Sequence, residues 1–145
     1  MEGAKPALRE GRIALLVEHV NNPRHRGVLR DADVVMPGGS PECGGSVVVY
    51  LKGDGNGKVE GLSWRGEGDT ISMGATSIVM ERVMDGHLTM EEVLRIDYDE
   101  FVQELGKDLI GSRTRNATLG LSTIKAAIRQ YRKGKLANTA EPTPA

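Results

Sequence analysis

The sequence predicts an α+β domain in which helices pack on one face of a small, three-stranded antiparallel sheet. After one short helical segment, strand patterns occupy residues 29–65 and helical patterns follow them. The length of 145 residues is enough for one domain with a proper core and too little for two. We expect a flexible lead-in at 1–11, a single domain over 12–135 and a disordered, Pro- and Ala-rich tail at 136–145.

The first two elements are a helix and a strand. Apolar residues from Ile13 to Val20 have the spacing of a short amphipathic helix, and Pro23 ends it. The segment Leu29–Pro37 carries enough apolar residues for one strand, and a glycine-rich loop follows.

The second and third strands form a predicted hairpin. Ser46–Lys52 is strongly β-branched, which favours a strand. Residues 53–57 read Gly-Asp-Gly-Asn-Gly and accept the positive φ angles of a tight turn. Alternation along Lys58–Arg65 then predicts the third strand.

The remainder of the chain is predicted to be helical. Apolar residues recur at helical spacing after the sheet, and Thr89 with Glu92 has the pattern of a capping box. The predicted helices cover Asp69–Met84, Thr89–Ile96, Asp99–Leu105 and Asn116–Lys133.

Composition excludes several classes of protein. A net charge of −1 gives no bulk attraction to nucleic acid or to a membrane, and no apolar run approaches the ~20 residues of a membrane span. A single cysteine excludes an internal disulfide framework, so we expect a cytoplasmic protein.

Residues 113–135 hold seven basic residues and no acidic one. They fit a solvated helix face with cations near its C-terminus, or a docking stripe for an acidic partner protein. Nucleic acid is disfavoured as a partner because no aromatic stacking platform accompanies the charges.

Cys43 is the only cysteine, and it lies in the run Gly-Gly-Ser-Pro-Glu-Cys-Gly-Gly at residues 38–45. A lone cysteine is commonly a small buried hydrophobe. Here Pro41 and the glycines instead indicate a shaped loop that can approach a bound group. No Ser/His/Asp or Cys/His arrangement accompanies Cys43, so we expect that the protein is not an enzyme.

Four segments together resemble the U-type iron–sulphur cluster scaffolds, the IscU, SufU and NifU N-terminal family. Residues 18–29 are similar to its D-H-Y-x-N-P-R-N-x-G-x-L opening, and 39–44 to its first-ligand loop, G-N-P-x-C-G. Residues 64–77 resemble the second-ligand loop of the SufU-like branch, and 113–119 resemble its third-ligand segment, R-x-K-C-A-T-L. The resemblance implies a SufE/NifU-like fold, which agrees with the predicted one.

The resemblance also implies a site that this chain has altered. In the family, three cysteines and one aspartate converge from three loops on a nascent cluster or a zinc ion. Cys43 keeps the first position, whereas Gly45 replaces the aspartate and Asp69 and Asn116 replace the other cysteines. Asp69 and Asn116 are expected either to cap helices or to serve as ligands with Cys43, Asp69 through oxygen and Asn116 weakly.

The resemblance therefore implies an iron–sulphur assembly scaffold that holds a cluster or a zinc or iron ion, and accepts sulphur from a cysteine desulphurase. Cluster-accepting proteins are the other expected partners, and a homo-oligomer would let two Cys43 thiolates share a cluster. The alternative is a regulatory or interaction module that keeps the fold and binds no metal or cluster. Further candidate ligands, by proximity in sequence, are His19, His25, Glu42 and Glu67.

Overall fold

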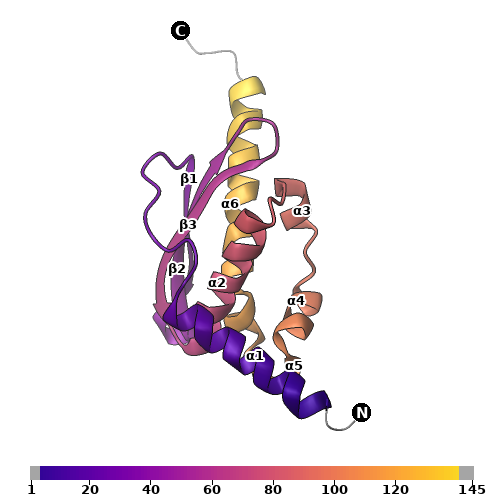
Figure 1. The fold of residues 1–145 in the computed structure, drawn as a ribbon. Helices are drawn as coiled ribbons and strands as arrows, with labels where there is room; N and C mark the ends of the chain where they lie inside the picture. The colour runs from indigo at the N-terminus through magenta and orange to yellow at the C-terminus, as the bar shows by residue number, and fades with distance from the viewer. Residues whose placement is uncertain (1–3, 141–145) are drawn as a thin grey trace.

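Three antiparallel strands form the central sheet in the order β1 (Val34–Ser40), β2 (Gly45–Gly53) and β3 (Val59–Gly68). Helices α2 (Thr70–Asp85) and α6 (Thr114–Ala140) pack side by side against one face of this sheet (Figure 1). The α+β class and the helical cover of one face are confirmed.

The computed structural model describes the backbone of residues 4–140 and, within it, the side chains of 8–42 and 44–134. Both predicted terminal segments overlap a described helix. Helix α6 continues to Ala140, through half of the segment 136–145 that was predicted to be a tail. Residues 141–145 lie outside the described part of the chain. No helix among the described residues is both long enough and apolar enough to cross a membrane.

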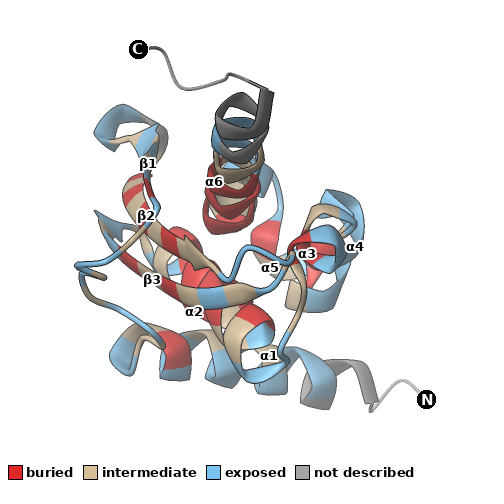
Figure 2. Cartoon of the chain, turned by 90° about the horizontal axis from the view of Figure 1, so that it is seen from above, coloured by how far each residue is buried: buried red, intermediate tan, exposed pale blue. Residues whose placement is uncertain are grey.

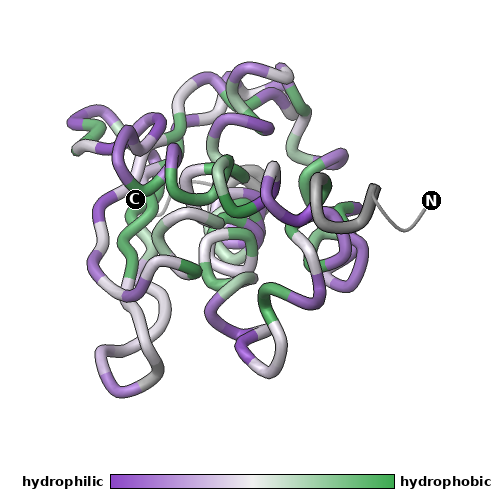
Figure 3. The backbone as a smooth tube through the Cα atoms, turned by 60° about the horizontal axis from the view of Figure 1, so that its bottom comes forward, coloured by the Kyte–Doolittle hydropathy of each residue, from purple (hydrophilic) through white to green (hydrophobic). Residues whose placement is uncertain are grey.

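Helix α1 (Ala4–Asn21) packs against α2 and begins well before Ile13. Residues 4–11 are therefore helical, in contrast to the predicted loose lead-in, and 1–3 lie outside the described part. The prediction relied on apolar periodicity, which residues 4–11 do not show. Figure 3 shows hydrophilic residues near the start of α1 and hydrophobic ones after them. Among its described side chains, the exposed large apolar ones are Leu8, Ile13, Leu15 and Val17.

The core lies between the sheet and the helices. Alternate residues of β2, Val47, Val49 and Leu51, point to the helical side and are buried. On the neighbouring strand β3, Trp64 lies opposite Val49 and Leu62 lies opposite Leu51, and both are buried as well. Figure 2 shows buried residues on the facing sides of the sheet, α2 and α6. Each of these large apolar side chains contributes about 1.5–3 kcal/mol through its removal from water.

Three short helices connect α2 to α6: α3 (Met90–Leu94), α4 (Tyr98–Leu105) and α5 (Lys107–Ile110). The predicted capping box is confirmed, because Thr89 Oγ1 accepts the Glu92 N–H and Glu92 Oε1 accepts the Thr89 N–H. Helix α5 was not predicted, since four residues are too few to show helical periodicity.

The basic segment of α6 is not a uniform solvated face. Lys125 is only 5% exposed, its ammonium donates to the Ile96 carbonyl, and it lies 4.2 Å from the centroid of the Tyr98 ring. Burial lowers the pKa of Lys125, and nearby Arg129 adds to this effect. Lys125 therefore ties α6 to the segment between α3 and α4, and is not available to an acidic partner.

A buried polar cluster joins α1 to α2. His19 is 1% exposed, and its Nδ1 lies 2.7 Å from the Ser77 hydroxyl, which accepts the Arg24 backbone N–H at 2.8 Å. The hydroxyl hydrogen is therefore free for Nδ1, which leaves the proton of the neutral ring on Nε2. That nitrogen faces Glu81 Oε1 at 3.6 Å, and Arg24 Nε donates to Glu81 Oε2 at 3.0 Å. Burial lowers the pKa of His19, reinforced by Arg24 and opposed by Glu81 and Glu18.

The protein is predicted to lose stability on acidification through His19. A lowered pKa in the folded state means that the unfolded chain takes up the proton first as pH falls below about 6.5. The stabilisation of the folded state by neutral His19 is thus complete above that pH, and it is lost as pH falls toward the folded-state pKa of His19. The melting temperature should fall between about pH 7 and pH 5, and fall less in His19→Asn.

His87→Asn is the matched control, because His87 is exposed and its φ of 53° is one that asparagine tolerates. This variant should keep the pH dependence of the parent. An unchanged pH dependence in His19→Asn would show that the buried ring is not its source.

Candidate functional site

Three segments that are distant in sequence converge at one end of the sheet. They are the turn after β1, formed by η1 (Pro41–Cys43) and Gly44, the start of α2 at Asp69, and the first turn of α6 at Asn116. The Asp69 N–H donates to the Gly44 carbonyl at 3.0 Å, and Asn116 Nδ2 donates to Asp69 Oδ2 at 2.8 Å. The structure therefore brings Asp69 and Asn116 together, beside the residue that follows Cys43.

Gly44 lies directly against these two side chains. It has a φ of +94°, and a Cβ atom built on it would be 2.3 Å from Asn116 Nδ2 and 3.6 Å from Asp69 Oδ2. Only glycine combines this backbone conformation with this close an approach. The glycine after Cys43 therefore allows the turn to pack against the start of α6.

Asp69 caps α2, as predicted, and both of its carboxylate oxygens accept hydrogen bonds. Oδ1 accepts the Ser72 N–H and the Ser72 hydroxyl, both at 2.8 Å, while Oδ2 accepts Asn116 and lies 3.8 Å from Arg113 Nη1. Burial alone would raise the pKa of Asp69. The hydrogen bonds from Ser72 and Asn116, with the nearby Arg113, outweigh burial and lower that pKa.

Asn116 does not cap α6, and that expectation is wrong. The helix begins at Thr114, so Asn116 is its third residue. Its side chain is consequently free to bond across to α2. The sequence showed where α6 starts only to within a few residues. The exact first residue decides whether the Asn116 side chain caps its own helix.

Gly45 lies in β2, opposite Gly68 of β3, and against Ser72. A Cβ atom on Gly45 would be 2.7 Å from Ser72 Oγ and 3.1 Å from Ser72 Cβ. The aspartate of the family pattern would therefore require Ser72 to move. The buried Ser72 is a residue that sequence reasoning missed, although its place three residues after an N-cap aspartate signals the backbone bond.

The two expected histidine ligands do not join this site. His19 is bonded to Ser77, which lies eight residues or about 12 Å along α2 from Asp69, and His25 is bonded to Asp85 at the far end of the same helix. Glu42 is exposed on the turn. Ser77, His19 and Glu81 form a serine–histidine–carboxylate cluster that sequence reasoning also missed, but burial of the first two leaves no room for a substrate.

The donor set does not form a closed metal site. Asp69 uses both oxygens as acceptors, Asn116 presents an N–H, and Gly45 has no side chain. Among residues with described side chains, no group of three or more His, Cys, Asp or Glu could hold a metal ion. Cys43 carries the only thiol that the sequence supplies.

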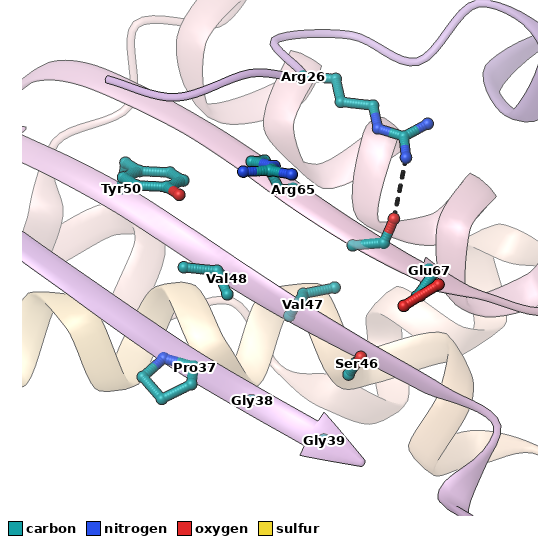
Figure 4. A pocket seen from close by; sticks show the side chains of 11 residues that line it. Arg26, Pro37, Gly38, Gly39, Ser46, Val47, Val48, Tyr50, Arg65 and Glu67 are labelled. Atoms are coloured by element: carbon teal, nitrogen blue, oxygen red, sulfur yellow. Dashed lines mark hydrogen bonds between the residues drawn. The ribbon is translucent and has the colours of Figure 1, made fainter. Parts of the chain in front are cut away.

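Two hollows are lined by residues that flank the turn, and Gly39 lines both. One, of about 480 Å³, runs beside α6 and is lined by Tyr98, Arg115 and Asn116. The other, of about 470 Å³, lies on the face of the sheet that α2 and α6 leave uncovered (Figure 4). There Glu67 extends from β3 on the side away from the helices, so it is not directed at Asp69.

Comparison with known proteins shows the family of this chain. The family described as "NifU-like N terminal domain" matches residues 14–138, and the chain therefore belongs to this family. The chain is 30% identical over 121 residues to the iron–sulfur cluster assembly scaffold protein IscU 1 of Archaeoglobus fulgidus, covering 82% of this chain and 76% of that protein. It is 35% identical over 69 residues to the zinc-dependent sulfurtransferase SufU of Bacillus subtilis, covering 48% and 46% respectively.

Solved structures share the fold. The N-terminal part of a nitrogen-fixing NifU-like protein from Brucella abortus superposes with a TM-score of 0.68 at 19% identity, over 82% of this chain and 92% of the other. A putative iron–sulfur cluster assembly scaffold protein for the SUF system from Fervidobacterium islandicum gives a TM-score of 0.60 at 17% identity, over 79% and 93%.

Substitution of Gly44 by alanine is predicted to destabilise the protein through both its backbone and its contact with Asn116. The control is Gly57→Ala, because Gly57 has a φ of +88° and no atom within 4 Å of its Cβ position. Both variants should lose about 1–2 kcal/mol of unfolding free energy from the left-handed backbone. Gly44→Ala should lose more in urea denaturation, and equal losses would contradict the close packing of the turn on α6.

Proposed function

We propose that this protein acts in iron–sulphur cluster assembly and receives sulphur at Cys43 from a cysteine desulphurase. The observation that carries the proposal is the convergence of the Cys43 turn with Asp69 and Asn116, in a chain of the NifU-like N-terminal family. Relatives named as scaffolds, and one named as a sulfurtransferase, support both parts of this function.

The transfer needs no residue beyond the thiolate. Cys43 attacks the outer sulphur of a persulphide on the desulphurase, so that a new S–S bond forms at Cys43. The S–S bond of the donor breaks, its cysteine leaves as a thiolate and takes up a proton, and no net oxidation occurs. Only the thiolate is nucleophilic, so the rate depends on the pKa of this thiol.

Iron, zinc or a cluster would be cargo at the same place. One subunit offers the Cys43 thiolate, and the Asp69 carboxylate, whose Oδ2 already accepts the Asn116 amide, would be the oxygen ligand beside it. Clusters are held mostly by thiolates, so further ligands would come from a second subunit or from a partner protein. Asn116, as a neutral amide, would contribute weakly.

A regulatory or interaction module is the second candidate. It is favoured by the same hydrogen bond, because Asp69 and Asn116 satisfy each other and leave no open ligand position between them. In that case the protein would keep the partner surface of the family without carrying sulphur or metal.

Sulphur transfer is tested by incubating the protein anaerobically with the cysteine desulphurase of the same organism and L-cysteine. Intact mass spectrometry should show the gain of one sulphur atom, absent in Cys43→Ser. In parallel, anaerobic reconstitution with iron and sulphide, or with zinc, measures metal bound per chain. If neither sulphur nor metal exceeds the Cys43→Ser level, the assembly function fails and the module function stands.

A double variant serves as the positive control for metal. Asp69→Cys with Asn116→Cys gives three thiols on the converging segments, while Gly45 is left unchanged because Ser72 occupies the space beside it. This variant should bind zinc, since thiolates are preferred zinc ligands. Folded protein without zinc would show that the Cys43 thiol does not face these two positions.

A further inference from the structure

We propose that Asp69 and Asn116 form a metal-independent clamp that positions the Cys43 turn. The clamp is defined by Asp69, Asn116, Ser72 and Gly44, and it joins β1–β2, α2 and α6. Its purpose, to present Cys43 for sulphur acceptance, rests on the proposed function, whereas the clamp itself does not.

The bonds of the clamp run from one segment to the next. Asn116 donates to Asp69 Oδ2, which joins α6 to α2 across 47 residues of sequence. Asp69 donates its backbone N–H to the Gly44 carbonyl, and the Ser72 hydroxyl lies 3.3 Å from the same carbonyl. The turn is therefore held through the backbone of the residue that follows Cys43.

Chemistry determines which atom of the Asn116 amide faces Asp69. The contact is 2.8 Å long, and an aspartate side chain is ordinarily a carboxylate at neutral pH. An amide oxygen at that distance from a carboxylate oxygen would be repelled without a cation between them, whereas the NH₂ group forms a charge-assisted hydrogen bond. The clamp thus closes on the protein's own donors and acceptors.

Packing couples the clamp to the turn. Because the Cβ position of Gly44 lies 2.3 Å from Asn116 Nδ2, the amide is in contact with the turn itself. Displacement of Asn116 from Asp69 would remove both the bond and the surface on which Gly44 rests. Arg113, 3.8 Å from Asp69 Oδ2, adds a positive charge on the same side.

Hydrogen exchange tests the clamp, read on peptides that cover residues 41–46 and 66–73. In the parent protein these amides should exchange at the same slow rate in EDTA and in zinc chloride. Asn116→Asp is nearly isosteric and turns the donor into a second carboxylate, so exchange in EDTA should become at least about tenfold faster. Parent exchange that is slowed strongly by zinc would overturn the clamp in favour of a metal site.

Two further variants make the result specific. The exchange of the two residues, Asp69→Asn with Asn116→Asp, restores one amide opposite one carboxylate and keeps an oxygen for Ser72, so slow exchange should return in EDTA. Asn22→Asp is the matched control, because Asn22 also donates its amide to a carboxylate, Glu18 Oε1 at 2.7 Å, but on the exposed surface of α1. It should leave both peptides unchanged.

The outcomes separate the clamp from the proposed function. The hydrogen-exchange experiment contains no desulphurase, so a failure of Cys43 to accept sulphur leaves its result intact. Loss of the clamp would likewise leave the sulphur-transfer result intact. If Asn116→Asp does not fold, recovery of folding in the double exchange variant supports the clamp. Fast exchange in the double variant, or equal effects of Asn116→Asp and Asn22→Asp, would overturn it.

Discussion

The Asp69 carboxylate is the constraint on which this end of the molecule depends. One oxygen caps α2 through Ser72 and the other accepts Asn116 from α6, while the backbone N–H of the same residue holds the Gly44 carbonyl. A single residue therefore sets the relation of two helices and of the turn that carries Cys43. Hydrogen bonds to a charged group contribute about 1.5–3 kcal/mol each, so this residue is also a large local contribution to stability.

A second polar centre does similar work about 12 Å further along α2. His19 reaches from the last turn of α1 to Ser77, and Arg24 joins both Ser77 and Glu81. Polar groups that are buried this deeply must be satisfied, so they determine how α1 and the following loop lie on α2. The apolar core holds the layers together, and the two polar centres fix how the connecting segments meet them.

Strong local patterns made the fold predictable, and weak ones did not. Strand β2 is a long β-branched segment, and the apolar stripe of α2 extends over several helical turns. Their periods are therefore unambiguous in the sequence. The start of α1 at Ala4 and the four-residue α5 carry no such period. The same imprecision at the start of α6 led to Asn116 being predicted as a cap, although its side chain bonds to α2.

The sequence by itself determined the fold class, the order of the elements, the likeness to the iron–sulphur scaffold family and the positions 43, 69 and 116 that matter in it. Those properties depend on local periodicity and on residue identity, both of which can be recognised along one chain. Only the tertiary structure decided what Asp69 and Asn116 do. A hydrogen bond needs its two atoms within about 3 Å of each other. For residues 47 positions apart, that distance is set by the packing of α2 against α6 and by the space that Gly44 leaves between them.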